Sequence, residues 1–425
     1  MFQTLKNAWK IAELRSKIIF TIVIIVLYRI GSVIPVPYVD ATALSSAFDN
    51  QSLFAYFNIL SGQAFSQATL FALSISPYIT SSIVIQLLTI AIPALERLSK
   101  EGPEGRKKLT QITRYCTVAL ALVTSIGYYT YLRNAIGILT DRSFFAAVVI
   151  IACYCAGASI IMWLAEKINE FGIGNGISMI LFANIVASLP SIIFVAFERA
   201  GTSSLGIVIP VITIVMLLAM IVFIVYVTNA ERRLPVQYAK RQVGRRMYGG
   251  QNTYIPMKLN MSGVMPIIFA SSIAAIPTTL ALIIPPKAGG VWEKIVGFFS
   301  STSPVYMVLY FLLIIGFSYF YLAISFNPVE IANNLKNNGG SVPGIRPGKP
   351  TTDYITKILG RITLIGAIFL GIVATLPLVV GMIDTNLAGL AFGGSSLLIL
   401  VSVALETFKE IEAQMTMRHY KGFLE

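Results

Sequence analysis

The sequence has little charge, few cysteines and a single histidine. Charged residues make up 12% of its 425 residues and hydrophobic residues 56%. A soluble protein, by contrast, has roughly 25% charged residues. Cys116, Cys153 and Cys155 all lie in apolar runs, which argues against a disulfide framework and against a metal site in a loop. His419 stands in a basic tail with no metal-binding neighbour. The composition therefore predicts a membrane protein without a catalytic or metal centre.

Motifs for nucleotide binding, zinc binding and nucleophilic catalysis are also absent. Gly172, Gly174 and Gly176 superficially resemble a phosphate-binding loop, but they join two apolar segments and follow no predicted strand. They predict a tight turn instead, because glycine readily adopts positive φ angles. The apolar segments contain almost none of the ionisable residues that bind a coupling ion near the centre of a bilayer. Arg29 lies within the first segment, and we expect its side chain to reach the membrane surface.

Ten segments are long and apolar enough to cross a bilayer, which takes about 20 residues of helix. The first is longer than the core of a signal peptide, roughly 7–15 residues, and no small-residue cleavage site follows it. The second and seventh are diluted by hydroxyl side chains and prolines. The ten predicted spans are 17–36, 70–95, 115–132, 144–164, 177–197, 205–228, 261–285, 304–326, 358–379 and 390–408.

The distribution of basic residues orients these spans. An even number of spans places both termini on one side, and an excess of Lys and Arg marks the cytoplasmic side. All but six of the 32 Lys and Arg fall on the side of the termini. We therefore predict that both termini are cytoplasmic. The six exceptions are Arg29, Arg133, Arg142, Arg199, Lys287 and Lys294.

Two cytoplasmic loops, 230–259 and 327–357, are each about 30 residues long, which is longer than most connections between packed helices. The first interleaves basic and aromatic residues, and the second surrounds Arg346 with turn-forming Pro and Gly, which predicts an exposed, stiff tip. A third basic cluster spans 105–108, and the tail 409–425 is basic as well. Such surfaces suit anionic lipid headgroups, ribosomal RNA or an acidic protein. Membrane topology and lipid alone would also account for the charge.

Two of the predicted spans carry an unusual number of neutral polar residues. Such residues can face water at one time and lipid at another, which charged residues cannot do cheaply. They therefore predict a wettable seam between the two spans, although each hydroxyl could instead bond its own helix backbone. The second span carries Ser74, Ser76, Thr80, Ser81, Ser82, Gln86 and Thr89, and the seventh region carries Asn260, Ser262, Ser271, Ser272, Thr278 and Thr279.

An apolar segment before the second span, 53–62, is too short to cross the membrane. As a helix it would reach roughly 15 Å, or half of a bilayer. We predict a re-entrant or interfacial half-helix. Such a segment is tolerated at depth when protein surrounds it or when it lines a cavity.

Several long motifs occur in an order that resembles the bacterial SecY family of protein-conducting channels. The resemblance covers nearly the whole chain, and its most specific stretches are 76–88, 101–106, 172–178, 238–242, 260–266 and 343–348. It implies an all-α polytopic fold of ten transmembrane helices in two five-helix halves, 1–200 and 201–425, related by a pseudo-twofold axis. It also implies an hourglass pore between the halves, a plug at about 53–66 and a place in the cell membrane.

The resemblance assigns roles to individual residues. A ring of apolar side chains narrows the pore, a plug blocks it at rest, and a lateral gate between spans two and three and spans seven and eight admits signal sequences to lipid. Leu181 replaces the isoleucine common in the bacterial family, which preserves the apolar character. The ring comprises Ile75, Ile79, Ile177, Leu181, Ile268 and Ile399; the plug comprises Leu53, Phe54, Phe57, Asn58, Leu60, Ser61, Gly62 and Phe65; the gate includes Thr80, Gln86, Asn260 and Ile276.

The resemblance also gives the long loops a purpose, which is to dock the motor ATPase SecA or the translating ribosome. The expected contacts are Lys240, Arg241, Arg245, Arg246 and Arg346. It implies SecE and SecG as partner subunits, secretory preproteins with their signal sequences as substrates, and no cofactor. Two alternatives are a secondary transporter for small solutes with inverted repeats, and an insertase or scaffold without a pore.

Overall fold

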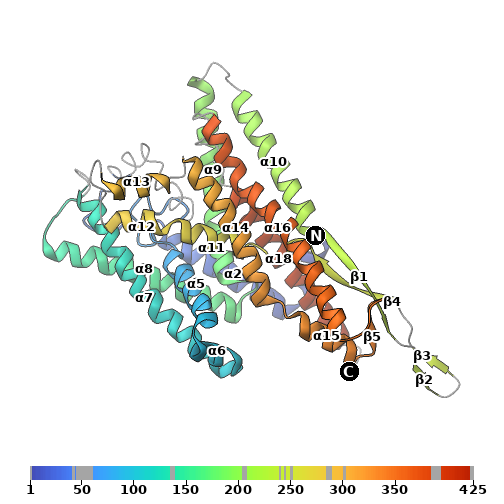
Figure 1. Cartoon of the computed structure of the whole chain (residues 1–425). Coiled ribbons are helices and arrows are strands. Elements are labelled where there is room, and N and C mark those ends of the chain that lie inside the picture. Colours follow the sequence, from blue (N-terminus) through green and yellow to red (C-terminus); the bar gives the residue numbers. More distant parts are fainter. Residues whose placement is uncertain are drawn as a thin grey trace.

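The protein forms a tilted bundle of helices with a small group of strands at one end (Figure 1). The computed structural model describes residues 2–40, 44, 61–134, 139–202, 208–238, 241–243, 246–248, 252–283, 290–299, 303–383 and 394–421. Within these residues the helices are α1 (Phe2–Lys10), α2 (Ala12–Gly31), α5 (Ser76–Ala91), α6 (Pro93–Lys100), α7 (Pro103–Asn134), α8 (Phe144–Phe171), α9 (Gly176–Thr202), α10 (Val208–Asn229), α11 (Met265–Ala274), α12 (Ile276–Ile283), α13 (Val291–Phe298), α14 (Pro304–Ser325), α15 (Pro328–Asn337), α16 (Lys349–Ile383) and α18 (Gly394–Lys421).

Prolines break two of the predicted spans. Helices α5 and α6 meet at 101°, because Ile92 precedes Pro93 and takes an extended conformation, with ψ of 113°. The seventh predicted span is two helices, α11 and α12, that meet at Ala275. Pro277 lacks the N–H that would bond the carbonyl of Ile273 and continue the helix. The prediction that spans 70–95 and 261–285 are continuous helices is therefore wrong at both prolines.

The helices confirm a polytopic membrane fold but not the number of crossings. Within the described residues, four helices are long and apolar enough to cross a membrane, or five if the bent pair α5 and α6 is one span. Three shorter apolar helices, within 176–190, 214–229 and 265–281, fall below that length. The ten-span count and the division into halves at residue 200 stay predictions.

The main core joins the beginning and the end of the chain. One cluster of buried apolar side chains takes members from α2, α5, α8, α9, α10, α11, α14, α16 and α18. Helix α5 packs on α7 and α11, α7 also packs on α8 and α12, and α9 packs on α10 and α18. The helices predicted for the first half therefore contact those predicted for the second through α5, α7 and α9.

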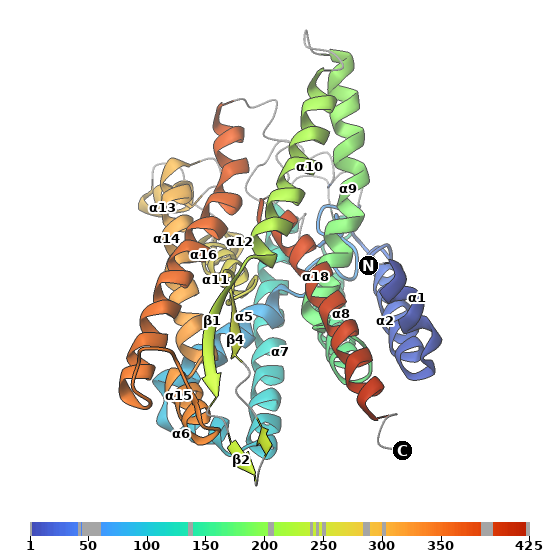
Figure 2. The ribbon, with the colours of Figure 1, turned by 90° about the vertical axis from the view of Figure 1, so that its right-hand side faces the viewer.

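The two long loops, predicted to be cytoplasmic, contain strands that the sequence analysis did not predict. Strand β1 (Glu231–Tyr238) pairs antiparallel with β4 (Asn252–Lys258) from the same loop and with β5 (Gly340–Ser341) from the other. A separate hairpin joins β2 (Arg241–Val243) to β3 (Arg246–Tyr248). Figure 2 shows the strands at the same end of the bundle as α6 and α15. The two loops are therefore one structural unit.

This unit has its own apolar core. Leu234 and Val236 alternate along β1 and both point inward, as expected for a strand with one buried face. They pack with Leu335 of α15 and with Ile355 and Leu359 of α16. The sheet is thus fixed to the first part of α16, whose later residues belong to the main core.

Residues 61–75 form consecutive turns rather than the expected helix. The second span therefore begins at Ser76, not at residue 70. The segment lies against α2 and the residues after it: the Leu70 N–H donates to the Ile34 carbonyl at 2.9 Å, and the Val36 N–H donates to the Ala68 carbonyl at 3.2 Å. On its other side, Gly157 of α8 lies directly against the carbonyl of Leu70.

Replacing Gly157 should separate α8 from this segment. A Cβ at Gly157 would overlap the Leu70 carbonyl oxygen, which belongs to the backbone and cannot rotate away. We expect Gly157→Ala to lower stability by about 1–3 kcal/mol, the usual cost of overpacking. Gly316 of α14 is the matched control, because a Cβ there would meet nothing within 4 Å. Gly316→Ala should leave the thermal midpoint of the detergent-solubilised protein unchanged or raised, whereas equal midpoints for both variants would contradict the prediction.

Candidate functional site

The structure brings the predicted ring residues together. Five of them are buried in the main core cluster, with exposed fractions from 0% for Ile75 to 7% for Ile399. Ile177 is half-buried and packs against the same cluster. The five come from the start of α5 and from α9, α11 and α18: Ile75, Ile79, Leu181, Ile268 and Ile399. Ile75 immediately precedes α5 and Ile79 follows one turn later, so both face inward.

A cavity of about 330 Å³ borders this cluster. Ile79, Leu181, Ile268 and Ile399 form part of its wall, whereas Ile75 and Ile177 do not line it. The rest of the wall comes from the same four helices and from α7, α12 and the segment before α5. Hydroxyl groups are interspersed with the apolar side chains: Ser76, Thr80, Thr124, Ser271, Ser272, Thr279, Ser395 and Ser396.

Two of the four predicted gate residues, Thr80 and Ile276, line this cavity. They stand on α5 and α12, next to the contacts of α5 with α11 and of α12 with α7. Gln86 is a half-buried residue of α5. Asn260 lies outside the cavity lining: it is buried just before α11, with its Cα facing Gly366 of α16. Its carboxamide oxygen and nitrogen have no hydrogen-bond partner among the described residues.

Several hydroxyls of the predicted seam bond their own helices. The Thr80 hydroxyl donates to the Ser76 carbonyl at 3.0 Å, and Thr89, Ser271 and Thr279 make similar bonds one turn back. For these hydroxyls the structure thus shows the alternative given above, in which each one bonds the backbone of its own helix. A hydroxyl satisfied in this way can face an apolar surface without leaving a donor unpaired, and it can still accept a bond from water.

The described part of the plug segment touches the same cavity. Phe65 lines the cavity, and its backbone carbonyl accepts a 2.6 Å hydrogen bond from the Tyr128 hydroxyl of α7. The two rings lie 4.6 Å apart. Ser61 is buried and accepts a hydrogen bond from the Phe65 N–H. The predicted plug residues Leu53, Phe54, Phe57, Asn58 and Leu60 lie outside the described residues.

Arg346 stands on an exposed turn between β5 and α16. Gly344 and Gly348 on either side have φ angles of 79° and 102°, which favour glycine. The Arg346 carbonyl accepts a hydrogen bond from the Thr351 hydroxyl at 2.8 Å, and nearby Val342 is buried in the core of the sheet unit. The backbone of this tip is therefore held in place while the Arg346 side chain is free to meet a partner.

The other predicted docking residues belong to the first loop. Arg241 and Arg246 begin strands β2 and β3, so the hairpin brings their backbones into one short ladder. Lys240 and Arg245 lie outside the described residues.

The sequence analysis missed the surroundings of Arg29, whose side chain was expected to reach the membrane surface. In the structure the residue is half-buried, and its Nη1 atom is buried without a hydrogen-bond partner among the described residues. A Cβ at Gly62 would lie 2.8 Å from this atom. No periodicity links positions 29 and 62, so only the folded chain could show the contact.

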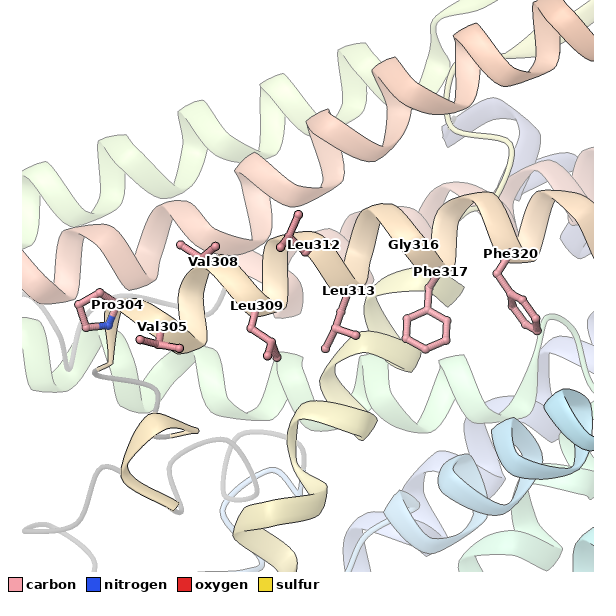
Figure 3. A pocket seen from close by; sticks show the side chains of 9 residues that line it. All are labelled: Pro304, Val305, Val308, Leu309, Leu312, Leu313, Gly316, Phe317 and Phe320. Atoms are coloured by element: carbon pink, nitrogen blue, oxygen red, sulfur yellow. The ribbon is translucent and has the colours of Figure 1, made fainter. Parts of the chain in front are cut away.

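A second hollow lies along α14 and is lined by apolar side chains and one glycine. Figure 3 shows the lining residues Pro304, Val305, Val308, Leu309, Leu312, Leu313, Gly316, Phe317 and Phe320 along one face of this helix. Val305, Val308 and Leu312 are at least half exposed. In a bilayer such a face is solvated by lipid tails, which are as apolar as these side chains.

The fold and the site define the class as a polytopic helical membrane protein whose centre is a buried apolar cluster beside a cavity. The described residues contain no group of three or more His, Cys, Asp or Glu that could hold a metal ion. The buried aliphatic side chains come from several helices and adjoin a cavity edged with hydroxyls.

Comparisons with known proteins identify the family. The SecY family profile matches residues 69–408. The protein translocase subunit SecY of Streptomyces galbus is 44% identical over the full length of both chains. The chain therefore belongs to the SecY family, the channel subunits of the protein translocase, which are not enzymes. The resemblance described above is confirmed.

Solved structures support the fold. A structure described as "The plug domain of the SecY protein stablizes the closed state of the translocation channel and maintains a membrane seal" has a TM-score of 0.69 at 19% identity, over 94% of this chain and 92% of that chain. Sec61 in the canine ribosome-channel complex from the endoplasmic reticulum has a TM-score of 0.64 at 18% identity, with the same coverage.

Joining α5 to α12 across the cavity should block translocation. We expect the double variant Thr80→Cys and Ile276→Cys, treated with a short bifunctional thiol reagent, to lose at least about tenfold in export rate if the gate must open. Cys116, Cys153 and Cys155 would first be replaced, since all three are free thiols. The same protein joined by a reducible linker is the control, because reduction should restore export. Normal export by the linked form would refute the gate assignment.

Proposed function

We propose that the buried apolar cluster is the constriction of a pore through which this channel subunit moves unfolded secretory polypeptides across the membrane. The observation that carries the proposal is the meeting of Ile75, Ile79, Leu181, Ile268 and Ile399, from four parts of the chain, in one buried cluster beside a cavity. Aliphatic side chains bind no particular residue, so they suit substrates of any sequence. A narrow apolar ring also closes to ions by dewetting.

The same cavity supports a gate toward lipid. It lies where α5 and α7 meet α11 and α12, and its wall carries Thr80 and Ile276. A wall of apolar and hydroxyl side chains accepts both a hydrophobic helix and water. We propose that signal sequences and transmembrane segments enter lipid by this route, with Gln86 and Asn260 on the same seam.

The segment at about 53–66 is proposed to be the plug. Support comes from Phe65, which lines the cavity, and from buried Ser61 and Gly62 beside it. The related SecY structure is described as having a plug domain that stabilises the closed state and maintains the membrane seal. A plug below the constriction would add a second barrier to the apolar ring.

The cytoplasmic sheet unit is proposed to dock the partner that supplies energy, either SecA or a translating ribosome. Its support is the exposed, backbone-anchored Arg346 and the hairpin that carries Arg241 and Arg246, with Lys240 and Arg245 next to them in the sequence. A related channel is described in a ribosome complex. We further propose SecE and SecG as partner subunits, anionic lipids at the basic surfaces, the cell membrane as the location, and two cytoplasmic termini.

Reconstitution tests the proposed function directly. The chain, purified with its co-purifying subunits and placed in vesicles with a motor ATPase and ATP, should protect an unfolded secretory polypeptide from added protease. Deleting residues 53–65 should produce an ion current in planar bilayers, which a scaffold without a pore would not give. Solute uptake by vesicles that contain only this chain, with no polypeptide transport, would favour the secondary transporter instead.

Reversing the charge at the docking tip should impair export without unfolding the protein. We expect Arg346→Glu to reduce SecA-dependent export at least about tenfold, because a like charge facing an acidic partner is strongly unfavourable. The tip itself should persist, since Thr351 bonds the backbone carbonyl and not the side chain. Arg142→Glu is the control, because Arg142 is exposed and predicted to lie on the opposite side of the membrane. Full export by the Arg346 variant would remove its role.

A further inference from the structure

Arg29 lies in the last turn of α2, inside the membrane-spanning part of the chain. A cation is favoured at that end of a helix by the helix dipole. Its Nη1 atom, however, is buried and has no acceptor among the described residues. A buried charged donor without an acceptor loses more solvation than it regains. Arg29 therefore raises the free energy of the state in which it is covered.

The turn segment 61–75, which overlaps the end of the proposed plug, covers this nitrogen. The point where a Gly62 Cβ would lie is 2.8 Å from Arg29 Nη1 and 3.1 Å from Asn184 Oδ1. Gly62 has a φ angle of 63°, and only glycine fits so close to both side chains. If this segment moved away, Arg29 Nη1 would lose this neighbour.

The backbone of the same segment also holds unfavourable conformations. Gln63, Ala68 and Ser74 have φ angles of 71°, 46° and 51°, in a region that residues with a Cβ rarely occupy. Three of the four such residues in the described chain thus fall within 61–75. Packing compensates for them, since the Tyr128 hydroxyl bonds the Phe65 carbonyl and the Tyr28 ring stacks on Phe71 at 5.5 Å.

We propose that Arg29 is a positioning residue that biases the resting channel toward opening. The Nη1 atom of its guanidinium is covered without an acceptor while the segment 61–75 is in place, and it regains hydrogen bonds to water when the segment moves. The packing of Phe65 and Phe71 stabilises the closed position of the segment, and Arg29 destabilises it. The free-energy difference between the closed and open states is therefore small enough for a signal sequence to shift. The inference rests on the proposed function, because it assumes that this segment moves as the channel opens.

Neutralising Arg29 should make the channel harder to open. In the reconstituted complex we expect Arg29→Met to lower the resting ion conductance, and to lower export of a substrate with a weakened signal sequence at least about fivefold. Export of a substrate with a strong signal should change little. Arg29→Lys keeps the charge and should stay close to the wild type. Arg15→Met is the control, because Arg15 is an exposed cation at the other end of α2.

Supplying an acceptor should have the same effect as removing the charge. The Cβ position of Gly62 lies 2.8 Å from Arg29 Nη1 and 3.1 Å from Asn184 Oδ1, so both atoms line the same small space. Asn184→Asp would place a negative charge in that space, and its attraction to Arg29 would stabilise the covered state. We expect lower resting conductance and lower weak-signal export for this variant too. If Arg29→Met fails to assemble, the Asn184→Asp variant still tests the role of Arg29.

The opposite sign would overturn the proposal. If Arg29 held the segment closed, Arg29→Met would raise the resting conductance and rescue weak signals, and an unchanged conductance would show that Arg29 has no part in opening. If the wild-type chain exports normally, a raised or an unchanged conductance in Arg29→Met rejects the role of Arg29 and leaves the proposed function intact. Failure of the wild-type chain to translocate any polypeptide would reject the proposed function itself.

Discussion

The burial of aliphatic side chains at the meeting point of α5, α9, α11 and α18 is the interaction on which the rest of the structure depends. One cluster contains Ile75, Leu181, Ile268 and Ile399, although the first and last of these lie more than 300 residues apart along the chain. In a bilayer, apolar burial gives little net attraction between helices, so close packing has to hold this centre together. A centre held by packing alone can separate without breaking a covalent or ionic bond.

The residues around this apolar cluster are also consistent with helices that can move apart. The hydroxyls of Thr80, Ser271 and Thr279 bond their own helices, so they do not bridge α5 to α11 and α12. Charge is placed elsewhere: the ion pair of Arg114 with Glu166 joins α7 to α8, both predicted to lie on the same side of the gate. Along the contacts of α5 with α11, these hydroxyls therefore add no bridge, and apolar side chains of the main core make the packing.

Local sequence rules predicted much of this arrangement. The i, i+4 spacing of Ile75 and Ile79 placed both on one face, and the turn formers around Arg346 placed it on an exposed tip. The same rules could have located the breaks at Pro93 and Pro277, where the expected spans ran on through a proline. Strand β1 alternates only twice between buried and exposed positions, at Leu234 and Val236, which is too short a pattern to distinguish from a loop. Strand β5 has two residues and exists only because β1 lies beside it.

Contacts between distant positions could not be predicted in this way. Asn260 was expected on the gate by family resemblance, but the structure buries it against α16, and its place in the seam stays a prediction. The contact of Arg29 with Gly62 depends on how the turns 61–75 fold back on α2, and no local propensity encodes that path. Whether residues 53–60 form a half-helix also stays a prediction.

The sheet shared by the two long loops has a mechanical consequence. Because β5 is bonded to β1, and the core beneath β1 includes Val342 and the start of α16, a load applied at the Arg346 turn is passed to β1 and to α16 together. Helix α6, by contrast, has no buried residue and is joined to α5 at a sharp bend. A partner that binds at the Arg346 turn would therefore act on packed parts of both long loops and on α16, whereas one that binds α6 would meet a helix without a core of its own.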